Sequence, residues 1–349
     1  MGPLPKKKRS IAIIGSGGIV EGAHLPAYKK AGFEAAVIYD RKSEKAENLA
    51  QKFNISNVAK TLDELVEIAQ EKNCVYDLAL PAKAILDIIS DLPNKSGILI
   101  QKPLGENFTE AEKIFDLCKE KQIVAGVNFQ LRQAPFITEA RQMIDNGEIG
   151  ELHDIDIKMT IFTPWYLWDF LYDLPRVEIL YHSVHYVDLV RFFFGNPEKI
   201  YAKTIKHPKM PNLASTKSSI YMDYGTYKRA TINTNHGHEY GPKHQESYIK
   251  FEGTQGGIKI RVGVNLDYPK GREDEFEFRL LSDDNGWKKK KIKGTWFPDA
   301  FIGPMAGLMK RMKDSNYNYI NSIDDSLETM KIVEAAYLSS EEGGTSLDM

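Results

Sequence analysis

The chain has 349 residues, of which 42% are hydrophobic and 27% are charged, and its formal net charge is −2. This near balance of charge gives no electrostatic basis for binding nucleic acid or a membrane surface. No apolar run approaches the ~20 residues of a membrane span, and the N-terminus lacks the apolar core of a secretory signal, so we expect a cytoplasmic protein. A chain of this length is expected to form two domains, because single domains cluster at ~100–150 residues.

The first β-rich run, residues 10–14, ends in a glycine turn, and helical periodicity then continues to about residue 30. Strand, glycine turn and helix in this order are typical of a dinucleotide-binding fingerprint. Gly15 permits the tight turn, and Gly17 lets the backbone approach a pyrophosphate. Val20 stands where a third glycine or alanine is usual. The expected cofactor contacts in this turn are Gly15, Ser16, Gly17, Gly18 and Ile19.

The second strand, residues 35–39, ends in Asp40. A carboxylate ~20 residues past the glycines accepts the ribose hydroxyls of an adenosine, and it would repel a 2′-phosphate. We therefore expect NAD as the cofactor. Arg41 and Lys42 follow at once and would tolerate the phosphate, so NADP stays an alternative.

Strands alternate with helices up to about residue 129, which predicts a doubly wound parallel sheet, a Rossmann domain, over residues 1–130. The strand at residues 75–80 ends in Leu80-Pro81, and the apolar strand at residues 98–100 delivers Gln101 and Lys102. In open α/β sheets, ligands bind at the carboxyl ends of the strands. The further cofactor contacts that we expect at this edge are Arg41, Leu80, Pro81, Gln101, Lys102 and Asn128.

Residues 131–349 change to a period of two, which is typical of antiparallel strands with one buried face. The run 154–161 is the first example, and similar runs follow up to about residue 292. We expect a C-terminal α+β domain with a large, open and mostly antiparallel sheet. One face of such a sheet is left without a partner, so a homodimer or homotetramer packed through that face is predicted.

A helix is predicted over residues 176–191, interrupting the strands. At helical spacing Glu178, Tyr181, His182 and His185 share one face. This polar stripe indicates a catalytic or binding surface, with a pair of satisfied histidines at a domain interface as the alternative.

Four motifs resemble those of the Gfo/Idh/MocA family, to which glucose-fructose oxidoreductase and inositol dehydrogenase belong, and the similarity runs in order from about residue 10 to 345. The motifs are Ala23-His24-Leu25-Pro26-Ala27, Tyr39-Asp40-Arg41, Lys102-Pro103 and Gly147-Glu148-Ile149-Gly150-Glu151. The resemblance implies a nicotinamide cofactor, a sugar or polyol substrate and a cis Lys-Pro peptide. This chain departs from the family pattern at Gln101, where a glutamate is usual, at Ile85, where a histidine is often found, and at Tyr181, where an aspartate is common.

The resemblance assigns the catalytic histidine to His185 and the acid-base pair to Lys102 and His185, with Tyr181 or His182 in place of the missing aspartate. The general base stays open between His185 and His182. A histidine can act as a general base at neutral pH. The positive charge of a nearby oxidised nicotinamide would favour the neutral form of Lys102. We therefore expect an NAD(P)-dependent dehydrogenase of a sugar, sugar derivative or polyol. Its alternatives are a glycoside-cleaving or epimerising enzyme that retains its NAD, and a non-catalytic sensor of dinucleotide and sugar.

The substrate contacts are predicted from polar and aromatic residues beyond the first domain: Arg132, Trp165, Trp168, Arg176, Glu178, His182 and His185. Aromatic rings stack on sugar faces, although core packing explains such rings equally well. Zinc held by His182, His185, His236 and His238 is an alternative. No acidic residue is fixed among these histidines by spacing, and the family normally works without metal, so we expect no metal.

Overall fold

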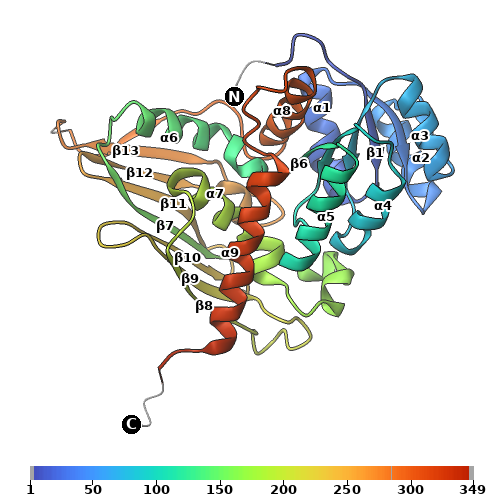
Figure 1. Cartoon of the computed structure of the whole chain (residues 1–349). Coiled ribbons are helices and arrows are strands. Elements are labelled where there is room, and N and C mark those ends of the chain that lie inside the picture. The colour runs from blue at the N-terminus through green and yellow to red at the C-terminus, as the bar shows by residue number, and fades with distance from the viewer. Residues whose placement is uncertain (1–3, 284, 346–349) are drawn as a thin grey trace. The chain divides into compact units, whose positions relative to one another are not determined.

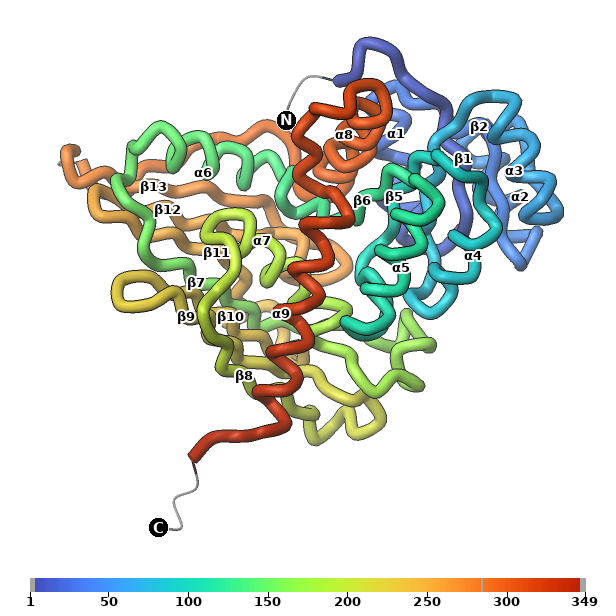
Figure 2. Tube along the Cα trace, viewed as in Figure 1, coloured from blue at the N-terminus to red at the C-terminus, as the bar shows by residue number. Residues whose placement is uncertain are grey.

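The structure, a computed structural model, describes residues 4–283 and 285–345. The chain divides into two compact units (Figure 1). The first comprises Met1–Ala134 and Thr295–Met330, and the second comprises Pro135–Gly294 and Lys331–Met349. In Figure 2, the first segment of the first unit runs from blue to teal and the first segment of the second unit from green to orange, while the orange-red to red end of the chain contributes to both units.

The first unit contains a six-stranded sheet in the order β3-β2-β1-β4-β5-β6, with every neighbouring pair parallel. This arrangement confirms the predicted Rossmann sheet. Its strand order reverses between β1 and β4, and such a switch point is where ligands bind in doubly wound folds. The strands are β1 Ile11–Ile14, β2 Ala35–Tyr39, β3 Asn57–Val58, β4 Val75–Leu78, β5 Gly97–Ile100 and β6 Val124–Val127.

Helices connect these strands, and side-chain caps fix where two of them begin. Thr61 Oγ1 accepts a hydrogen bond from the backbone of Glu64, and Asn107 Oδ1 accepts one from the backbone of Glu110. The helix after the glycine turn differs from a regular α-helix, because its first turn is a π-helix. The connecting helices are η1 Val20–His24, α1 Leu25–Ala31, α2 Ser43–Phe53, α3 Leu62–Glu71, α4 Ile85–Asp91 and α5 Phe108–Glu120.

A late segment of the chain, residues 295–330, belongs to the first unit, whereas the sequence placed all of residues 131–349 in the second domain. Its helix α8, Ile302–Lys313, packs on β5 and β6. Gly97 and Gly126 make this close approach possible. A Cβ on Gly97 would lie 2.9 Å from Met312, and one on Gly126 would lie 2.1 Å from the Tyr319 hydroxyl.

The second unit contains an eight-stranded sheet in the order β14-β13-β12-β11-β7-β10-β9-β8. Only β7 and β10 pair in parallel among the described strands of this sheet, so the predicted open and mostly antiparallel sheet is confirmed. The strands are β7 Leu152–Thr160, β8 Lys199–Ile205, β9 Lys217–Asp223, β10 Arg229–Asn235, β11 Glu246–Gly253, β12 Gly256–Arg261, β13 Glu275–Leu280 and β14 Lys288–Lys290.

Helices of the second unit cover one face and one edge of this sheet. The predicted helix over residues 176–191 is a π-helical turn, η6 Glu178–Ser183, followed by α7 Val184–Phe194, and these contact β9 and β10. The other helices are α6 Pro135–Asp145 and the C-terminal half of α9 Ile323–Glu342. Ser339 and Ser340 of α9 accept hydrogen bonds from the backbone of β8, which protects that edge strand. Among the described residues, no helix is both long and apolar enough to cross a membrane.

Candidate functional site

The glycine turn after β1 is held in a conformation that a larger residue could not adopt. Gly15 has a φ of +105°, and a Cβ there would lie 2.3 Å from the carbonyl oxygen of Ala79. Around Gly17 and Gly18, by contrast, an added Cβ would meet no atom within 4 Å. The turn therefore packs tightly against the β4 loop at Gly15 and leaves its outer backbone open, which is the shape that a pyrophosphate needs.

Asp40 lies beside this turn and is held in place by three donors. Its Oδ2 accepts hydrogen bonds of 2.8 Å from both the backbone and the hydroxyl of Ser16, and its Oδ1 accepts one of 2.8 Å from the backbone of Lys42. Burial alone would raise the pKa of Asp40, but these hydrogen bonds outweigh it and lower the pKa below its ordinary value. The residues fit the ribose of a dinucleotide bound over the turn, while Arg41 is exposed and Ile19 is partly buried.

The loops after β4, β5 and β6 carry the remaining predicted cofactor contacts. Leu80 is partly buried and Pro81 is exposed, whereas Gln101 and Asn128 are buried. The Asn128 amide donates a 3.0 Å hydrogen bond to Gln101 Oε1, which brings these two predicted residues together. Gln101 thus keeps a hydrogen-bonding role at the position where the family usually has a glutamate.

Lys102 follows β5 and forms a cis peptide bond with Pro103, as the resemblance implied. Its side chain is partly buried. Burial lowers the pKa of Lys102 to about 8, because a buried ammonium loses its hydration. A lysine with this pKa exists in both protonation states near neutral pH, which suits acid-base chemistry.

A buried polar network behind this loop was not predicted as part of the site. His24 Nδ1 lies 2.7 Å from Asp77 Oδ2, and the Tyr28 hydroxyl donates to the same oxygen at 2.7 Å. Asn128 Nδ2 lies 3.3 Å from His24 Nε2, which connects the pair to Gln101. The signal in the sequence was Asp77 itself, since a carboxylate inside a buried strand requires partners.

In the second unit, only part of the predicted polar stripe lies together: Glu178 is near His182, whereas Tyr181 packs elsewhere. Glu178 is fully buried and lies 3.9 Å from His182 Nδ1, and the His182 side chain is 21% exposed. Tyr181 instead places its ring 5.8 Å from that of Phe170. His185 lies in the first turns of α7 and is 6% exposed.

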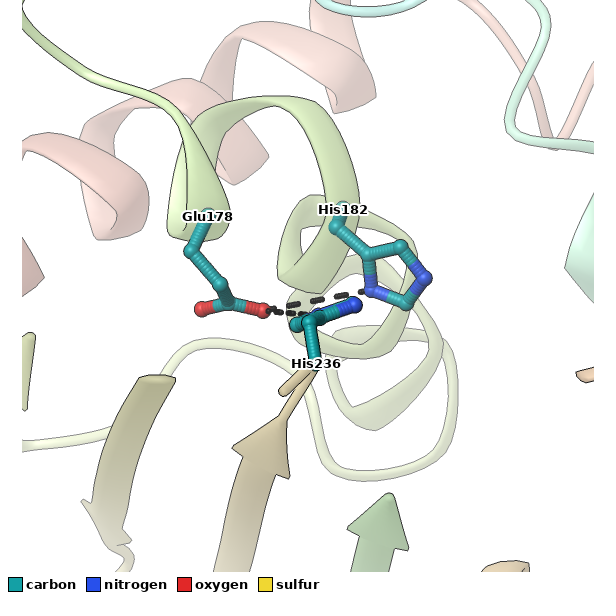
Figure 3. Close-up of side chains that lie close together, drawn as sticks. All are labelled: Glu178, His182 and His236. Carbon is teal, nitrogen blue, oxygen red and sulfur yellow. Dashed lines mark hydrogen bonds and ion pairs between the residues drawn. The ribbon is translucent and has the colours of Figure 1, made fainter. Parts of the chain in front are cut away.

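The residue that joins Glu178 and His182 is His236, which follows β10. Its Nε2 lies 3.2 Å from Glu178 Oε1, and its ring lies 4.3 Å from that of His182 (Figure 3). Burial alone would raise the pKa of Glu178, but His236 and the hydroxyls of Ser218 and Ser183 stabilise the carboxylate and lower its pKa. The sequence could not pair these residues, because their contact depends on where β10 ends beside η6.

Of the other predicted substrate contacts, the two arginines already bind groups of this chain, and the two tryptophans differ in exposure. Arg132 binds the Ile320 carbonyl and Asp325, both at 2.6 Å, and these bonds account for its burial. Arg176 forms a bidentate pair with Glu334, with hydrogen bonds of 2.7 and 2.8 Å. Trp165 is buried, whereas Trp168 is 40% exposed.

Two family models match the chain. Residues 9–129 match an oxidoreductase family's NAD-binding Rossmann fold, and residues 141–348 match the C-terminal alpha/beta domain of the same family.

Curated relatives include a regulator as well as an enzyme. The chain is 25% identical to the galactose/lactose metabolism regulatory protein GAL80 of Saccharomyces cerevisiae over 279 residues, 76% of this chain and 61% of that protein. It thus spans about three fifths of the length of that relative. It is 21% identical to D-xylose 1-dehydrogenase (NADP(+)) 2 of Haloferax volcanii over 335 residues, 95% of this chain and 97% of that protein.

A solved structure shares the fold over nearly the whole length. The oxidoreductase from Agrobacterium radiobacter in complex with NAD+, L-tartaric acid and magnesium superposes with a TM-score of 0.79. It is 20% identical in sequence, and the match covers 97% of this chain and 98% of that one. The two family models, which together cover most of the sequence, show that this chain belongs to the Gfo/Idh/MocA family of oxidoreductases.

Proposed function

We propose that the chain is a dehydrogenase that oxidises a hydroxyl group of a sugar, sugar derivative or polyol, with NAD preferred over NADP. The observation that carries this proposal is the turn in which Gly17 and Gly18 leave their backbone open beside an ionised Asp40. A carboxylate at this point accepts ribose hydroxyls and disfavours a 2′-phosphate. The relative from Haloferax volcanii, named as an NADP(+)-dependent xylose dehydrogenase, supports the substrate class and keeps NADP as the alternative.

Lys102 and His185 are the proposed acid-base pair. When bound, the nicotinamide supplies the acceptor for the hydride. The chain itself must then hold the substrate oxygen and take up its proton. His185 is proposed to take up the hydroxyl proton, because a histidine accepts protons near neutral pH. Lys102, with its pKa of about 8, is proposed to hold the substrate oxygen by a hydrogen bond. Each such group is typically worth ~10²–10⁴ in rate.

Tyr181 and His182 are proposed to take over the role of the aspartate that the family commonly has at position 181. His182 keeps some solvent exposure and lies near a buried carboxylate, which makes it the second candidate for the base. On the substrate side, the exposed ring of Trp168 is available for stacking on a sugar, whereas the guanidinium groups of Arg132 and Arg176 are engaged by carboxylates.

The test is the near-ultraviolet absorbance of reduced nicotinamide while the purified protein is screened, with NAD and NADP separately, against aldoses, polyols, sugar acids and anhydrosugars. Lys102→Ala is assayed in parallel, with Lys113→Ala on the exposed side of α5 as the matched control. We expect a signal that Lys102→Ala abolishes and Lys113→Ala preserves. A signal that survives in Lys102→Ala would contradict the assigned role of this lysine.

A second candidate is a non-catalytic sensor that binds dinucleotide and sugar. The similarity to a regulatory protein of galactose and lactose metabolism favours it, together with Tyr181 in place of the family's aspartate. Under this candidate the cofactor binds, but no substrate in the panel reduces it. Product analysis on glycosides then distinguishes a sensor from an enzyme that retains its NAD, because only the enzyme changes the glycoside.

The open face of the eight-stranded sheet is proposed as the surface of a homodimer or homotetramer. Its rows of polar pairs, such as Asp154 with Arg229 and Asp156 with Thr231, lie beside the exposed rings of Tyr201 and Tyr221. Light scattering after size-exclusion chromatography tests this proposal. Tyr201→Asp is expected to lower the measured mass to that of a monomer, and a monomeric wild-type chain would refute the proposal.

A further inference from the structure

A carboxylate and two imidazoles converge in the second unit. Glu178 and His182 lie one turn apart on η6, and His236 is the first residue after β10. Their potential ligand atoms all lie within 4.8 Å of one another. Figure 3 shows the Glu178 carboxylate pointing toward both rings. In the described part of the chain, no other three histidine, cysteine or acidic residues come this close together.

The spacing of these atoms is close to what a tetrahedral metal ion requires. Zinc bonds to imidazole nitrogen and carboxylate oxygen are ~2.0–2.2 Å, so tetrahedral ligand atoms lie about 3.4 Å apart. Glu178 Oε1 is 3.2 Å from His236 Nε2 and 3.9 Å from His182 Nδ1. All three atoms lie within 4.8 Å of one another, so binding one ion requires the side chains to rotate until the ligands close toward this spacing.

The residues around the cluster orient it for metal binding. His236 Nδ1 lies 2.7 Å from Thr163 Oγ1, and this hydroxyl can accept the ring N–H that a metal-binding histidine usually donates to a carboxylate, a carbonyl or water. The Ser183 hydroxyl donates a 2.7 Å hydrogen bond to Glu178 Oε1. The ring of Trp165 packs 4.9 Å from that of His236 and limits its rotation.

The carboxylate has capacity left for a cation. Glu178 is fully buried, its Oε1 accepts from Ser183 and lies 3.2 Å from His236 Nε2, and within residues 4–283 and 285–345 its Oε2 forms no hydrogen bond of standard geometry, although the Ser218 hydroxyl is near enough to stabilise the carboxylate. The carboxylate is therefore held in its charged form, which is the form that binds a metal ion.

We propose that Glu178, His182 and His236 form a binding site for a divalent transition metal, with zinc as the ion that the two-nitrogen, one-oxygen ligand set favours. Three protein ligands leave a fourth position for water or a substrate oxygen, as in catalytic zinc sites. The acidic ligand that the sequence spacing lacked is Glu178. His238 stands outside the cluster, since its Nε2 lies 3.1 Å from the Lys243 carbonyl.

The test is a titration of the full chain, first stripped with a chelator, with ZnCl₂ and separately with CoCl₂, in the absence of dinucleotide and sugar. We expect one zinc ion per chain and the intense visible bands of tetrahedral cobalt. His182→Ala is the first variant, because a partly exposed side chain is the least disruptive to remove, and it should weaken zinc binding by at least about 100-fold. His238→Ala is the matched control and should bind as the wild type does.

Thr163→Val tests the orienting hydroxyl and should weaken binding by about 10- to 100-fold. Far-ultraviolet circular dichroism verifies that each variant is folded. Absence of stoichiometric zinc binding in the wild type would overturn the proposal, and so would binding that His182→Ala leaves unchanged. Because no cofactor or substrate is present, this result is independent of whether the chain is a dehydrogenase.

Discussion

The imidazole of His24 and the carboxylate of Asp77 form a fully buried pair, with Nδ1 2.7 Å from Oδ2. His24 ends the π-helical turn that follows the glycine turn, and Asp77 lies inside β4. Asn128 continues the contact to Gln101, the residue before Lys102. One polar network therefore ties the nucleotide-binding turn to the loop that carries the proposed catalytic lysine.

Asp77→Ala is expected to destabilise the chain by several kcal/mol, because it leaves the buried His24 imidazole and Tyr28 hydroxyl without their shared partner, and each unsatisfied buried polar group costs about 1–3 kcal/mol. His24→Ala should cost less when Asp77 is already replaced, since the two share one interaction. Urea denaturation of the two single variants and the double variant measures this coupling. Asp116→Asn, on the exposed side of α5, is the control and should change stability by less than about 0.5 kcal/mol. Additive effects of the two alanine substitutions would show that the pair is not coupled.

Gly15 and Gly17 are expected to respond to alanine in opposite ways. Gly15→Ala should lower the free energy of unfolding by more than about 2 kcal/mol, because its Cβ would meet the Ala79 carbonyl at a φ of +105°. Gly17→Ala places its Cβ in open space, so the melting temperature should stay near that of the wild type. NAD affinity should nevertheless fall, because the new methyl group occupies the approach of the pyrophosphate.

Thermal melts and a fluorescence titration with NAD measure both effects. Gly22→Ala, in the π-helical turn η1 that follows, is the control, because an added Cβ there also meets no atom within 4 Å. If Gly17→Ala bound NAD as tightly as Gly22→Ala does, the assignment of the turn to the pyrophosphate would be wrong.

Much of the first unit could be predicted because its information is local. Alternating strands and helices, the glycine turn and Asp40 at the end of β2 are all read from neighbouring residues. The two-residue strand β3 carries too little periodicity to be recognised. The return of residues 295–330 depends on Met312 and Tyr319 meeting distant glycines, which no local pattern records.

In the candidate site of the second unit, too, local contacts could be predicted and long-range contacts could not. Helical spacing placed Glu178 and His182 on one face, and the structure keeps them near each other. Helical spacing could not place His236. This residue reaches Glu178 and His182 only because β10 pairs in parallel with β7 and ends beside η6. The π-helical turn was also outside the reach of periodicity, because its apolar pattern resembles that of an α-helix.

Asp40→Asn is expected to shift cofactor preference toward NADP. The wild-type carboxylate is held ionised by Ser16 and Lys42, so it repels a 2′-phosphate, and the amide does not. The ratio of the dissociation constants for NAD and NADP should change by at least about tenfold, or ~1.4 kcal/mol. Glu44→Gln, in the first turn of α2, is the control. An unchanged ratio in Asp40→Asn would mean that the adenosine ribose binds elsewhere.

Lys102→Met is expected to change how stability depends on pH. Burial lowers the pKa of Lys102 to about 8, whereas an unfolded lysine has a pKa of ~10.4. Between these values the unfolded chain binds more protons than the folded chain, so wild-type stability gains from Lys102 as pH rises. At pH 7 the folded chain carries the cost of a buried ammonium, which methionine removes.

The measurement is the free energy of unfolding of wild type and Lys102→Met at about pH 7 and about pH 9.5. The variant's advantage should shrink between the two pH values by on the order of 1 kcal/mol, because partial solvent contact screens the lysine and reduces the full effect of its pKa shift. Lys113→Met, at an exposed position of α5, corrects for the general effect of pH on the rest of the chain. An advantage of Lys102→Met that is the same at both pH values would mean that Lys102 titrates as an ordinary surface lysine, and the acid-base role proposed for it would lose its physical basis.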